Sequence, residues 1–335
     1  MATLKDVASL AGVSAKTVSN VVNGYAFVKP ENRRRVLEAM SATGYRPNIG
    51  ARNLRRGRTG FIALVVPELS IPYFGELAGL VITAAQERDW NVLIEQTLGV
   101  RDRERSTLAA LGPHIVDGTI LSPEALQTAD FAELAPNIAM VMLGEHSVEL
   151  AIDHVAIDNV LAAQTAVAHL IAIGRKRIAV IGQNPHRGTA ALRLEGYRKA
   201  LAAAEIEPRP EFVVPAMTYH RRDGAEAMAQ LLSLPQPPDA VFCFNDLLAF
   251  GALRAAADRG LRTPQDIAIV GFDNTEESAY SLPSLTTVAP NKLAIARTAV
   301  DLLHRRVTSA EQFPPQDIQT TFSLEIREST VGAQR

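Results

Sequence analysis

The pattern of hydrophobic and polar positions changes near residue 60. Before that point, apolar residues recur every three to four positions, as on one face of an α-helix, and glycines interrupt the pattern. After it, apolar runs of four to seven residues alternate with amphipathic helical stretches, which is typical of repeated β–α–β units. The pattern predicts an all-α domain at the amino end and an α/β core of parallel sheets flanked by helices.

Two short helices joined by a tight turn are predicted at the start of the chain. Thr3 and Asp6 have the spacing of a capping box, and Gly12 ends the helix that follows. Ser14 can cap the next helix, whose Val18 side chain faces inward. Two helices connected in this way form a helix-turn-helix, the arrangement that places its second helix in the major groove of DNA.

A third helix is predicted after this pair. Pro30 suits its first turn, and Gly44 suits its end. Its apolar face is predicted to consist of Val36, Leu37 and Met40.

The polar face of the second helix carries residue types that read base edges. Lys16 can donate to guanine, Asn20 can pair with adenine, and Ala15 can contact a thymine methyl group. Thr17 and Ser14 are better placed for phosphates. The alternative is a three-helix scaffold whose polar faces are only solvated.

Nine strands and several long helices are predicted in the core. The helices include residues 74–88, 159–173 and 246–258. The strands are Phe61–Val66, Val92–Glu95, Thr119–Leu121, Ile138–Leu143, Val155–Ile157, Arg177–Ile181, Phe212–Val214, Ala240–Phe244 and Ile267–Val270.

Charge separates the two parts of the chain. Residues 1–60 contain eleven Lys and Arg against three acids, a net charge of +8, so the rest carries −10 of the total of −2. A basic segment on an acidic body indicates a polyanionic partner for that segment alone.

The single cysteine, Cys243, excludes an internal disulfide framework and fits a cytoplasmic protein. No apolar run is long enough for a membrane span, and the first residues do not resemble a signal peptide.

The stretch TLKDVASLAGVSAKTVSNVVNG, from Thr3 to Gly24, resembles the head of LacI/GalR-family transcriptional regulators. The motif GYRPN, from Gly44 to Asn48, is similar to that family's approach to its hinge. The resemblance implies a helix-turn-helix domain over residues 1–47, a hinge helix and linker over 48–58, and a two-lobed, periplasmic-binding-protein-like core over 59–335. Lobe one would cover about 60–159 and 291–320, and lobe two about 160–289 and 321–332.

In this family the hinge helix pairs with its dimer mate in the minor groove, so the resemblance implies an apolar wedge at Leu54 near Ala51 on the groove floor. Residues 48–58 are too short for a stable free helix, and Gly50 weakens them further. The DNA-binding residues that we expect are Thr3, Leu4, Ser14, Ala15, Lys16, Thr17, Ser19, Asn20, Asn23, Tyr45, Asn48, Ala51, Arg52, Leu54 and Arg55.

The family's core binds an effector between its lobes, beyond the carboxyl ends of the strands. By resemblance, Arg193 anchors the ligand, Asp273 in the motif VGFDN accepts its hydrogen bonds, and aromatic rings cover it. Taken alone, Asp246 and Asp273 can equally be helix caps. The effector-binding residues that we expect are Tyr73, Phe74, Arg187, Thr189, Arg193, Tyr219, Asn245 and Asp273.

The sequence therefore predicts a homodimeric repressor of a near-palindromic operator, controlled by a small molecule, with residues 74–88 in the dimer contact. A sugar or sugar derivative is the expected effector, and a purine or nucleoside is the alternative within the same architecture. An enzyme is disfavoured because no phosphate loop, nucleophile elbow or metal-ligand spacing is present, so we expect no cofactor and no metal. A solute-binding protein would lack the basic head, and a regulator whose cleft binds a partner protein remains a further alternative.

Overall fold

The computed structural model describes residues 2–22, 25–45, 58–134, 138–144, 152–184, 188–309, 311 and 313–332. The chain divides into two compact units, Met1–Thr59 and Gly60–Arg335. The first unit is helical in its described part and the second is α/β, which confirms the predicted fold class.

The first unit contains the three predicted helices, α1 (Leu4–Ala11), α2 (Ala15–Val22) and α3 (Pro30–Thr43). Thr3 and Asp6 form the predicted capping box, in which the Asp6 backbone N–H donates to Thr3 Oγ1 over 3.3 Å. Ser14 Oγ accepts a hydrogen bond from the backbone N–H of Thr17 at 3.1 Å and so caps α2. Gly12 has a φ of 59°, which only glycine adopts without strain, and ends α1.

The core of this unit corrects one detail of the sequence analysis. Leu37 was expected on the apolar face of α3, but its side chain is 53% exposed. Val36 and Ala39 form the buried face instead, with Met40 partly buried beside them. Because adjacent helical residues point about 100° apart, Leu37 cannot share the face of Val36 while Ala39 also does.

The first lobe of the core is a six-stranded parallel sheet with the order β11-β5-β4-β3-β1-β2. Four helices accompany it: α5 (Pro72–Gln86), α6 (Arg101–Ala110), α7 (Thr128–Leu134) and α13 (Lys292–Thr308). The strands are β1 (Phe61–Val66), β2 (Asn91–Gln96), β3 (Gly118–Leu121), β4 (Ala139–Leu143), β5 (Asp153–Ile157) and β11 (Asp317–Thr320).

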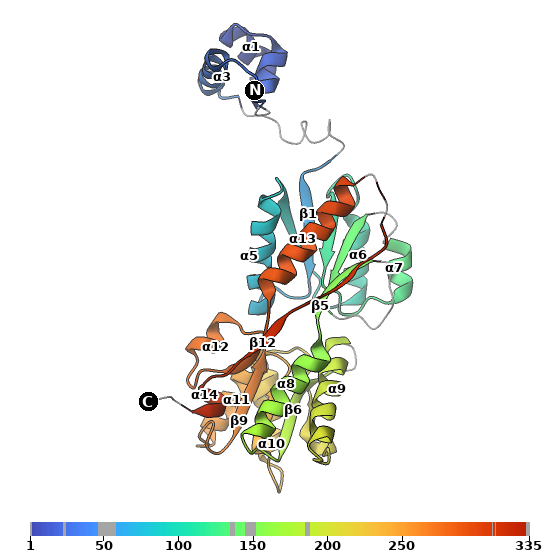
Figure 1. The fold of residues 1–335 in the computed structure, drawn as a ribbon, viewed down its shortest axis with the longest axis vertical. Helices are drawn as coiled ribbons and strands as arrows, with labels where there is room; N and C mark the ends of the chain where they lie inside the picture. Colours follow the sequence, from blue (N-terminus) through green and yellow to red (C-terminus); the bar gives the residue numbers. More distant parts are fainter. Residues whose placement is uncertain are drawn as a thin grey trace. The chain divides into compact units, whose positions relative to one another are not determined.

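This sheet is buried on both faces, as its central strand shows. Alternate residues of β1 point to opposite sides: Ile62 joins the cluster that contains Leu77 of α5, whereas Ala63 joins the one that contains Leu108 of α6. Helices α5 and α13 therefore cover one face, and α6 and α7 the other (Figure 1).

The second lobe is also six-stranded, with the order β12-β10-β9-β8-β6-β7, and only the pair β10–β12 is antiparallel. Its strands are β6 (Ile178–Gln183), β7 (Val213–Pro215), β8 (Ala240–Cys243), β9 (Ala268–Phe272), β10 (Thr286–Pro290) and β12 (Phe322–Glu325). Its helices are α8 (Asn159–Ala172), α9 (Gly188–Ala203), η2 (Pro210–Phe212, a 3-10 turn), α10 (Arg221–Leu232), α11 (Asp246–Asp258), α12 (Glu276–Tyr280) and α14 (Glu328–Val331).

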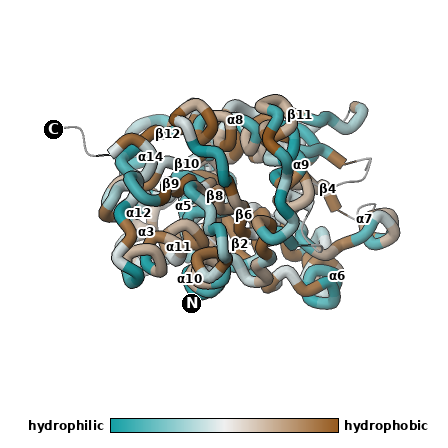
Figure 2. The backbone as a smooth tube through the Cα atoms, turned by 90° about the horizontal axis from the view of Figure 1, so that it is seen from below, coloured by the Kyte–Doolittle hydropathy of each residue, from teal (hydrophilic) through white to brown (hydrophobic). Residues whose placement is uncertain are grey.

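Helices α8 and α9 pack closely together at Gly196. A Cβ at this position would lie 2.2 Å from the carbonyl oxygen of Val160, so only glycine fits there. Hydrophobic segments gather along β6 and β8, and hydrophilic segments lie toward the outside (Figure 2). The chain passes between the lobes three times: from β5 into α8, from β10 into α13, and from β11 into β12 (Figure 1).

Each strand expected from the sequence is present, with ends that differ by at most two residues. Strands β10, β11 and β12 were not predicted. Strand β10 is fully buried but contains two threonines, and β11 and β12 are half-exposed and polar, so none has a clear apolar run.

Candidate functional site

Helix α2 presents a polar face outward, as the sequence analysis expected. Ala15 and Lys16 are exposed, whereas Val18 and Val21 are buried against α1 and α3. Thr17, Ser19 and Asn20 are partly exposed; Thr3 and Ser14 are exposed; and Leu4 and Tyr45 are partly buried. Six of the residues expected to bind DNA lie outside the described residues: Asn23, Asn48, Ala51, Arg52, Leu54 and Arg55.

A cavity of about 120 Å³ lies between the two lobes of the core. Residues from β5, α5 and the loop after β3 form its wall in lobe one, and residues from α9, β9 and the loops after β7, β8 and β9 form the opposite wall. The structure brings together in this cavity Tyr73, Phe74, Thr189, Arg193, Tyr219, Asn245 and Asp273, all of which were expected from the sequence. The eighth expected residue, Arg187, lies outside the described residues.

Arg193 projects from the first turns of α9 and is held by three protein groups. Its Nε donates to Oδ1 of Asn159 at 2.9 Å, and Nη1 donates to the carbonyl oxygen of Phe244. Its guanidinium lies over the ring of Phe272, with the Cζ atom 3.5 Å from the ring centroid. The group is thus fixed in one orientation beside the cavity.

Asp273 supplies a carboxyl group to the same wall. It follows β9, its residue is only 7% exposed, and its φ of 114° is unusual for a residue other than glycine. Burial raises the pKa of Asp273 well above its ordinary value, although the nearby charge of Arg193 opposes this shift. Burial likewise raises the pKa of the Tyr73 hydroxyl on the other wall, with Asp273 adding to the effect.

Asn245 and Tyr219 line the cavity but use their polar atoms within the protein. Asn245 caps α11: its Oδ1 accepts from the N–H of Leu248 at 2.9 Å, and its Nδ2 donates to the carbonyl oxygen of Tyr219 at 3.0 Å. The Tyr219 hydroxyl donates to the carbonyl oxygen of Gly182. Tyr219 thus has the ring that the sequence analysis expected over a ligand, but its hydroxyl is directed at backbone.

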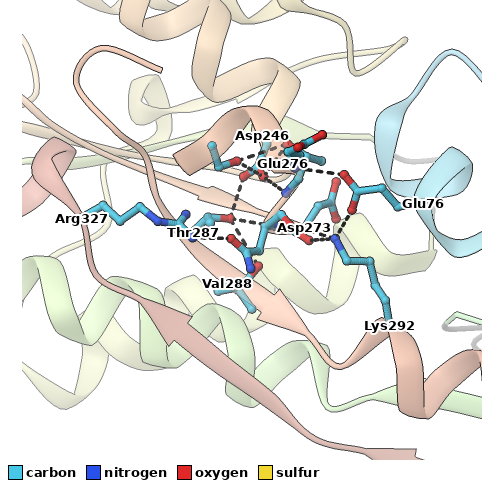
Figure 3. A network of polar contacts seen from close by, with 11 residues as sticks. Glu76, Asp246, Asp273, Glu276, Thr287, Val288, Lys292 and Arg327 are labelled. Atoms are coloured by element: carbon cyan, nitrogen blue, oxygen red, sulfur yellow. Dashed lines mark hydrogen bonds and ion pairs between the residues drawn. The ribbon is translucent and has the colours of Figure 1, made fainter. Parts of the chain in front are cut away.

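Asp246, next to this cap, is fully buried in a structural network (Figure 3). Its carboxylate accepts from the Thr275 backbone N–H at 2.8 Å, from Ser278 Oγ at 2.6 Å and from Thr287 Oγ1 at 2.6 Å. These contacts join α11, α12 and β10. Asp246 is therefore a buried structural acid and does not cap α11, contrary to its alternative interpretation as a helix cap; the cap is Asn245.

Several cavity residues were missed by the sequence analysis. Asn159 and Phe272 position Arg193, and Ser122 and Glu124 bring polar atoms from lobe one. Ser122 and Glu124 follow directly after β3, and this place at the carboxyl end of a strand was the available signal.

Within the described part of the chain, no helix is long and apolar enough to cross a membrane, and no His, Cys, Asp or Glu cluster is suited to a metal ion.

A helix-turn-helix head and a two-lobed α/β core with a cavity between its lobes define a class of bacterial regulatory protein. Residues 3–48 match the family described as "Bacterial regulatory proteins, lacI family", and residues 167–330 match the periplasmic binding protein-like domain. The HTH-type transcriptional repressor PurR of Haemophilus influenzae is 33% identical over 335 residues, which cover 98% of each chain. The HTH-type transcriptional repressor CytR of Escherichia coli is 36% identical over 304 residues, 90% of this chain and 89% of the relative.

Among solved structures, the Lac repressor dimer bound to operator and the anti-inducer ONPF matches with a TM-score of 0.85 and 27% sequence identity. The match covers 98% of this chain and 99% of that one. The chain therefore belongs to the lacI family of bacterial regulatory proteins, and the predicted DNA-binding transcriptional regulator is confirmed.

Proposed function

We propose that the protein is a homodimeric repressor whose affinity for operator DNA is set by a small molecule bound between the lobes of its core. The observation that carries the proposal is the convergence of Tyr73 and Phe74 from one lobe with Arg193, Tyr219 and Asp273 from the other on one cavity. A ligand that contacts both walls stabilises one arrangement of the lobes over another, and thereby shifts the population of DNA-binding molecules.

A sugar or sugar derivative is the effector class that this cavity suits best. Arg193 offers donors, Asp273 offers an acceptor, and Tyr73, Phe74 and Tyr219 offer aromatic surfaces. The volume of about 120 Å³ is similar to the roughly 150 Å³ of a cavity that holds one benzene ring. This size favours a monosaccharide or a free purine over a nucleoside, which has both a sugar and a base.

The head supplies the DNA-binding half of the proposal. Lys16, Ser19 and Asn20 lie on the accessible face of α2, on a segment of net charge +8. Two such heads related by two-fold symmetry would read a near-palindromic operator. The curated relatives are repressors, and the solved relative is a dimer on its operator, which supports a regulator rather than an enzyme. We expect the protein to act in the cytoplasm, where operator DNA lies.

Purified protein should first select duplexes from a genomic fragment pool at physiological salt. The selected duplex is then titrated in the presence of D-ribose, D-glucose, D-galactose, adenosine, cytidine or hypoxanthine. We expect at least a 10³-fold preference over random duplex. We expect one sugar to change the affinity for the selected duplex by about 5- to 150-fold; that sugar is termed the responsive compound. A response to a nucleoside or base alone would favour the competing effector class, and equal binding to all duplexes would contradict the function.

A further inference from the structure

Lys292, the first residue of α13, directs its ammonium group toward Asp273 and Glu76 (Figure 3). Its Nζ donates to the carbonyl oxygen of Asp273 at 3.0 Å and to that of Asn274 at 2.8 Å. The same ammonium group forms an ion pair with Glu76. The Lys292 side chain is only 13% exposed, so its charge depends on these oxygen atoms for the solvation that water would otherwise supply.

The two carbonyl groups belong to a strained piece of backbone. Asp273 and Asn274 have φ values of 114° and 48°, and residues other than glycine rarely adopt a positive φ. Such a conformation persists only when surrounding contacts hold it. Lys292 holds it from one side, and Arg327 holds it from the other by donating from Nη2 to Oδ1 of Asn274 at 2.7 Å.

Glu76 connects this backbone to the other lobe. It is part of α5 in lobe one, and one of its carboxylate oxygens pairs with Lys292. The other oxygen accepts from the backbone N–H of Glu276 in α12 of lobe two, at 3.0 Å. The Glu76 carboxylate thus bridges the lobes directly, and Lys292 bridges them a second time through the carbonyls of Asp273 and Asn274.

We propose that Lys292 is a positioning residue that links the conformation of Asp273 to the closure of the lobes. This proposal rests on the proposed function, in which Asp273 accepts hydrogen bonds from the effector. Lys292 and Glu76 both belong to lobe one, so when the lobes separate they withdraw together, and the carbonyls of Asp273 and Asn274 in lobe two lose the ammonium group. Asp273 is therefore held in its ligand-facing conformation chiefly when the lobes are together, and a ligand that binds this carboxylate favours closure.

Three variants of the full-length protein separate the two roles of Lys292. Lys292→Met removes the ion pair and both hydrogen bonds to backbone. Glu76→Met removes the contacts between lobes that Glu76 makes but leaves Lys292 able to donate to the carbonyls. Asp301→Asn is the matched control, because it breaks the Arg88–Asp301 ion pair, which joins the turn after α5 to α13 away from the cavity.

The first readout is hydrogen exchange in the peptide that contains Asp273 and Asn274, measured without DNA or ligand. The Asp273 backbone N–H donates to the Val288 carbonyl oxygen, and the Asn274 N–H donates to Thr287 Oγ1, so both report the local conformation. We expect at least tenfold faster exchange in Lys292→Met. Glu76→Met, which favours lobe separation, should also speed exchange, but by less than Lys292→Met, because Lys292 can still donate to the carbonyls whenever the lobes are together. Asp301→Asn should stay within threefold of wild type, and Lys292→Arg, which retains charge and donors, should keep exchange slow.

The second readout is the distance between two spin labels, at Asp102 in lobe one and Ala257 in lobe two. Both sites are exposed, and the native Cys243 is buried, so labelling is confined to the introduced cysteines. Lys292→Met and Glu76→Met should each lengthen or broaden the distance distribution, while Asp301→Asn leaves it unchanged. If Lys292→Met does not fold, Lys292→Gln, which removes the charge but keeps N–H donors, takes its place and should both lengthen the distance and speed exchange.

Unchanged exchange in folded Lys292→Met, or an unchanged distance in Glu76→Met, would overturn the proposal. Neither readout involves DNA or effector. A failure of the proposed function would therefore appear in the duplex titrations while these results stand, and the reverse also holds.

Discussion

Arg193 is stacked on Phe272, with its guanidinium carbon 3.5 Å from the centroid of the ring. Together with the hydrogen bonds to Asn159 and Phe244, this contact fixes a cation at the cavity wall before any ligand arrives. A group that is already oriented loses less conformational entropy when a ligand binds. The arrangement makes Arg193 the residue on which effector recognition depends most.

Arg193→Ala should abolish the response to the responsive compound while leaving duplex binding intact. Loss of hydrogen bonds from a charged donor costs about 1.5–3 kcal/mol, so the affinity for the compound should fall roughly 10- to 150-fold. Calorimetry on the core and duplex titration on the whole protein provide the two measurements. Arg198→Ala, an exposed residue of the same helix, is the matched control. A full response in Arg193→Ala would show that the ligand binds elsewhere.

Asp273→Asn should stabilise the free protein at neutral pH while weakening binding of the responsive compound. Because burial raises the pKa of Asp273 in the folded state, folding favours the protonated carboxyl group. The ionised group therefore lowers the free energy of unfolding as pH rises through its folded-state pKa. We expect a higher Tm than wild type at pH 7, with the difference vanishing below the ordinary pKa of 3.8.

Asp266→Asn provides the comparison of opposite sign. Hydrogen bonds from Arg262 lower the pKa of Asp266, so its ionised form stabilises the folded state above the ordinary pKa. Its removal should lower the Tm at pH 7. If Asp273→Asn also lowered the Tm there, the burial cost assigned to Asp273 would be incorrect.

Asn20→Ala should relax the sequence preference at one base pair in each half-site. A bidentate contact with adenine contributes about 1–3 kcal/mol of discrimination, so the preference at that position should fall about 5- to 150-fold. Titration of duplexes with single base-pair changes measures this effect. Lys5→Ala, on the exposed surface of α1, should instead weaken binding to every duplex equally, whatever its sequence. A uniform loss in Asn20→Ala would place Asn20 at the backbone of the DNA.

Gly79→Arg should prevent dimer formation without damaging the monomer. A Cβ at Gly79, on the exposed face of α5, would meet no described atom within 4 Å, and replacing a helical glycine removes a cost of roughly 0.5–1 kcal/mol. A long charged side chain there would, however, obstruct a second copy of the helix. Sedimentation should show a monomer with an undiminished Tm. Ala257→Arg, on an exposed face of α11, should remain dimeric; a dimeric Gly79→Arg would move the interface away from α5.

The alternation of buried strands and amphipathic helices was sufficient to predict the α/β core. Strand β1, for example, was predicted with its correct ends because all its positions except Phe61 are fully buried. Strand β10 was missed since its two threonines are satisfied by tertiary partners: Thr287 donates to Asp246, 41 residues away. Hydrogen bonds of this kind make polar residues compatible with a buried strand, and they leave no periodic signal in the sequence.

The cavity was predicted largely through family resemblance, which supplied Arg193 and Asp273. The residues that orient them were not foreseen. Lys292 and Glu76 are 216 positions apart, and neither lies in a motif that suggests their contact. Their pairing depends on the return of the chain from lobe two into α13, which is a property of the topology rather than of any local pattern.

If one coupling free energy links the cavity to DNA binding, the effector must change duplex affinity by the same factor by which the duplex changes effector affinity. The affinity of the responsive compound should be measured by calorimetry for free protein and for protein saturated with the selected duplex. We expect the two affinities to differ by the same factor, about 5- to 150-fold, by which the compound changes duplex affinity. Equal affinities for the free and DNA-bound protein would contradict this coupling.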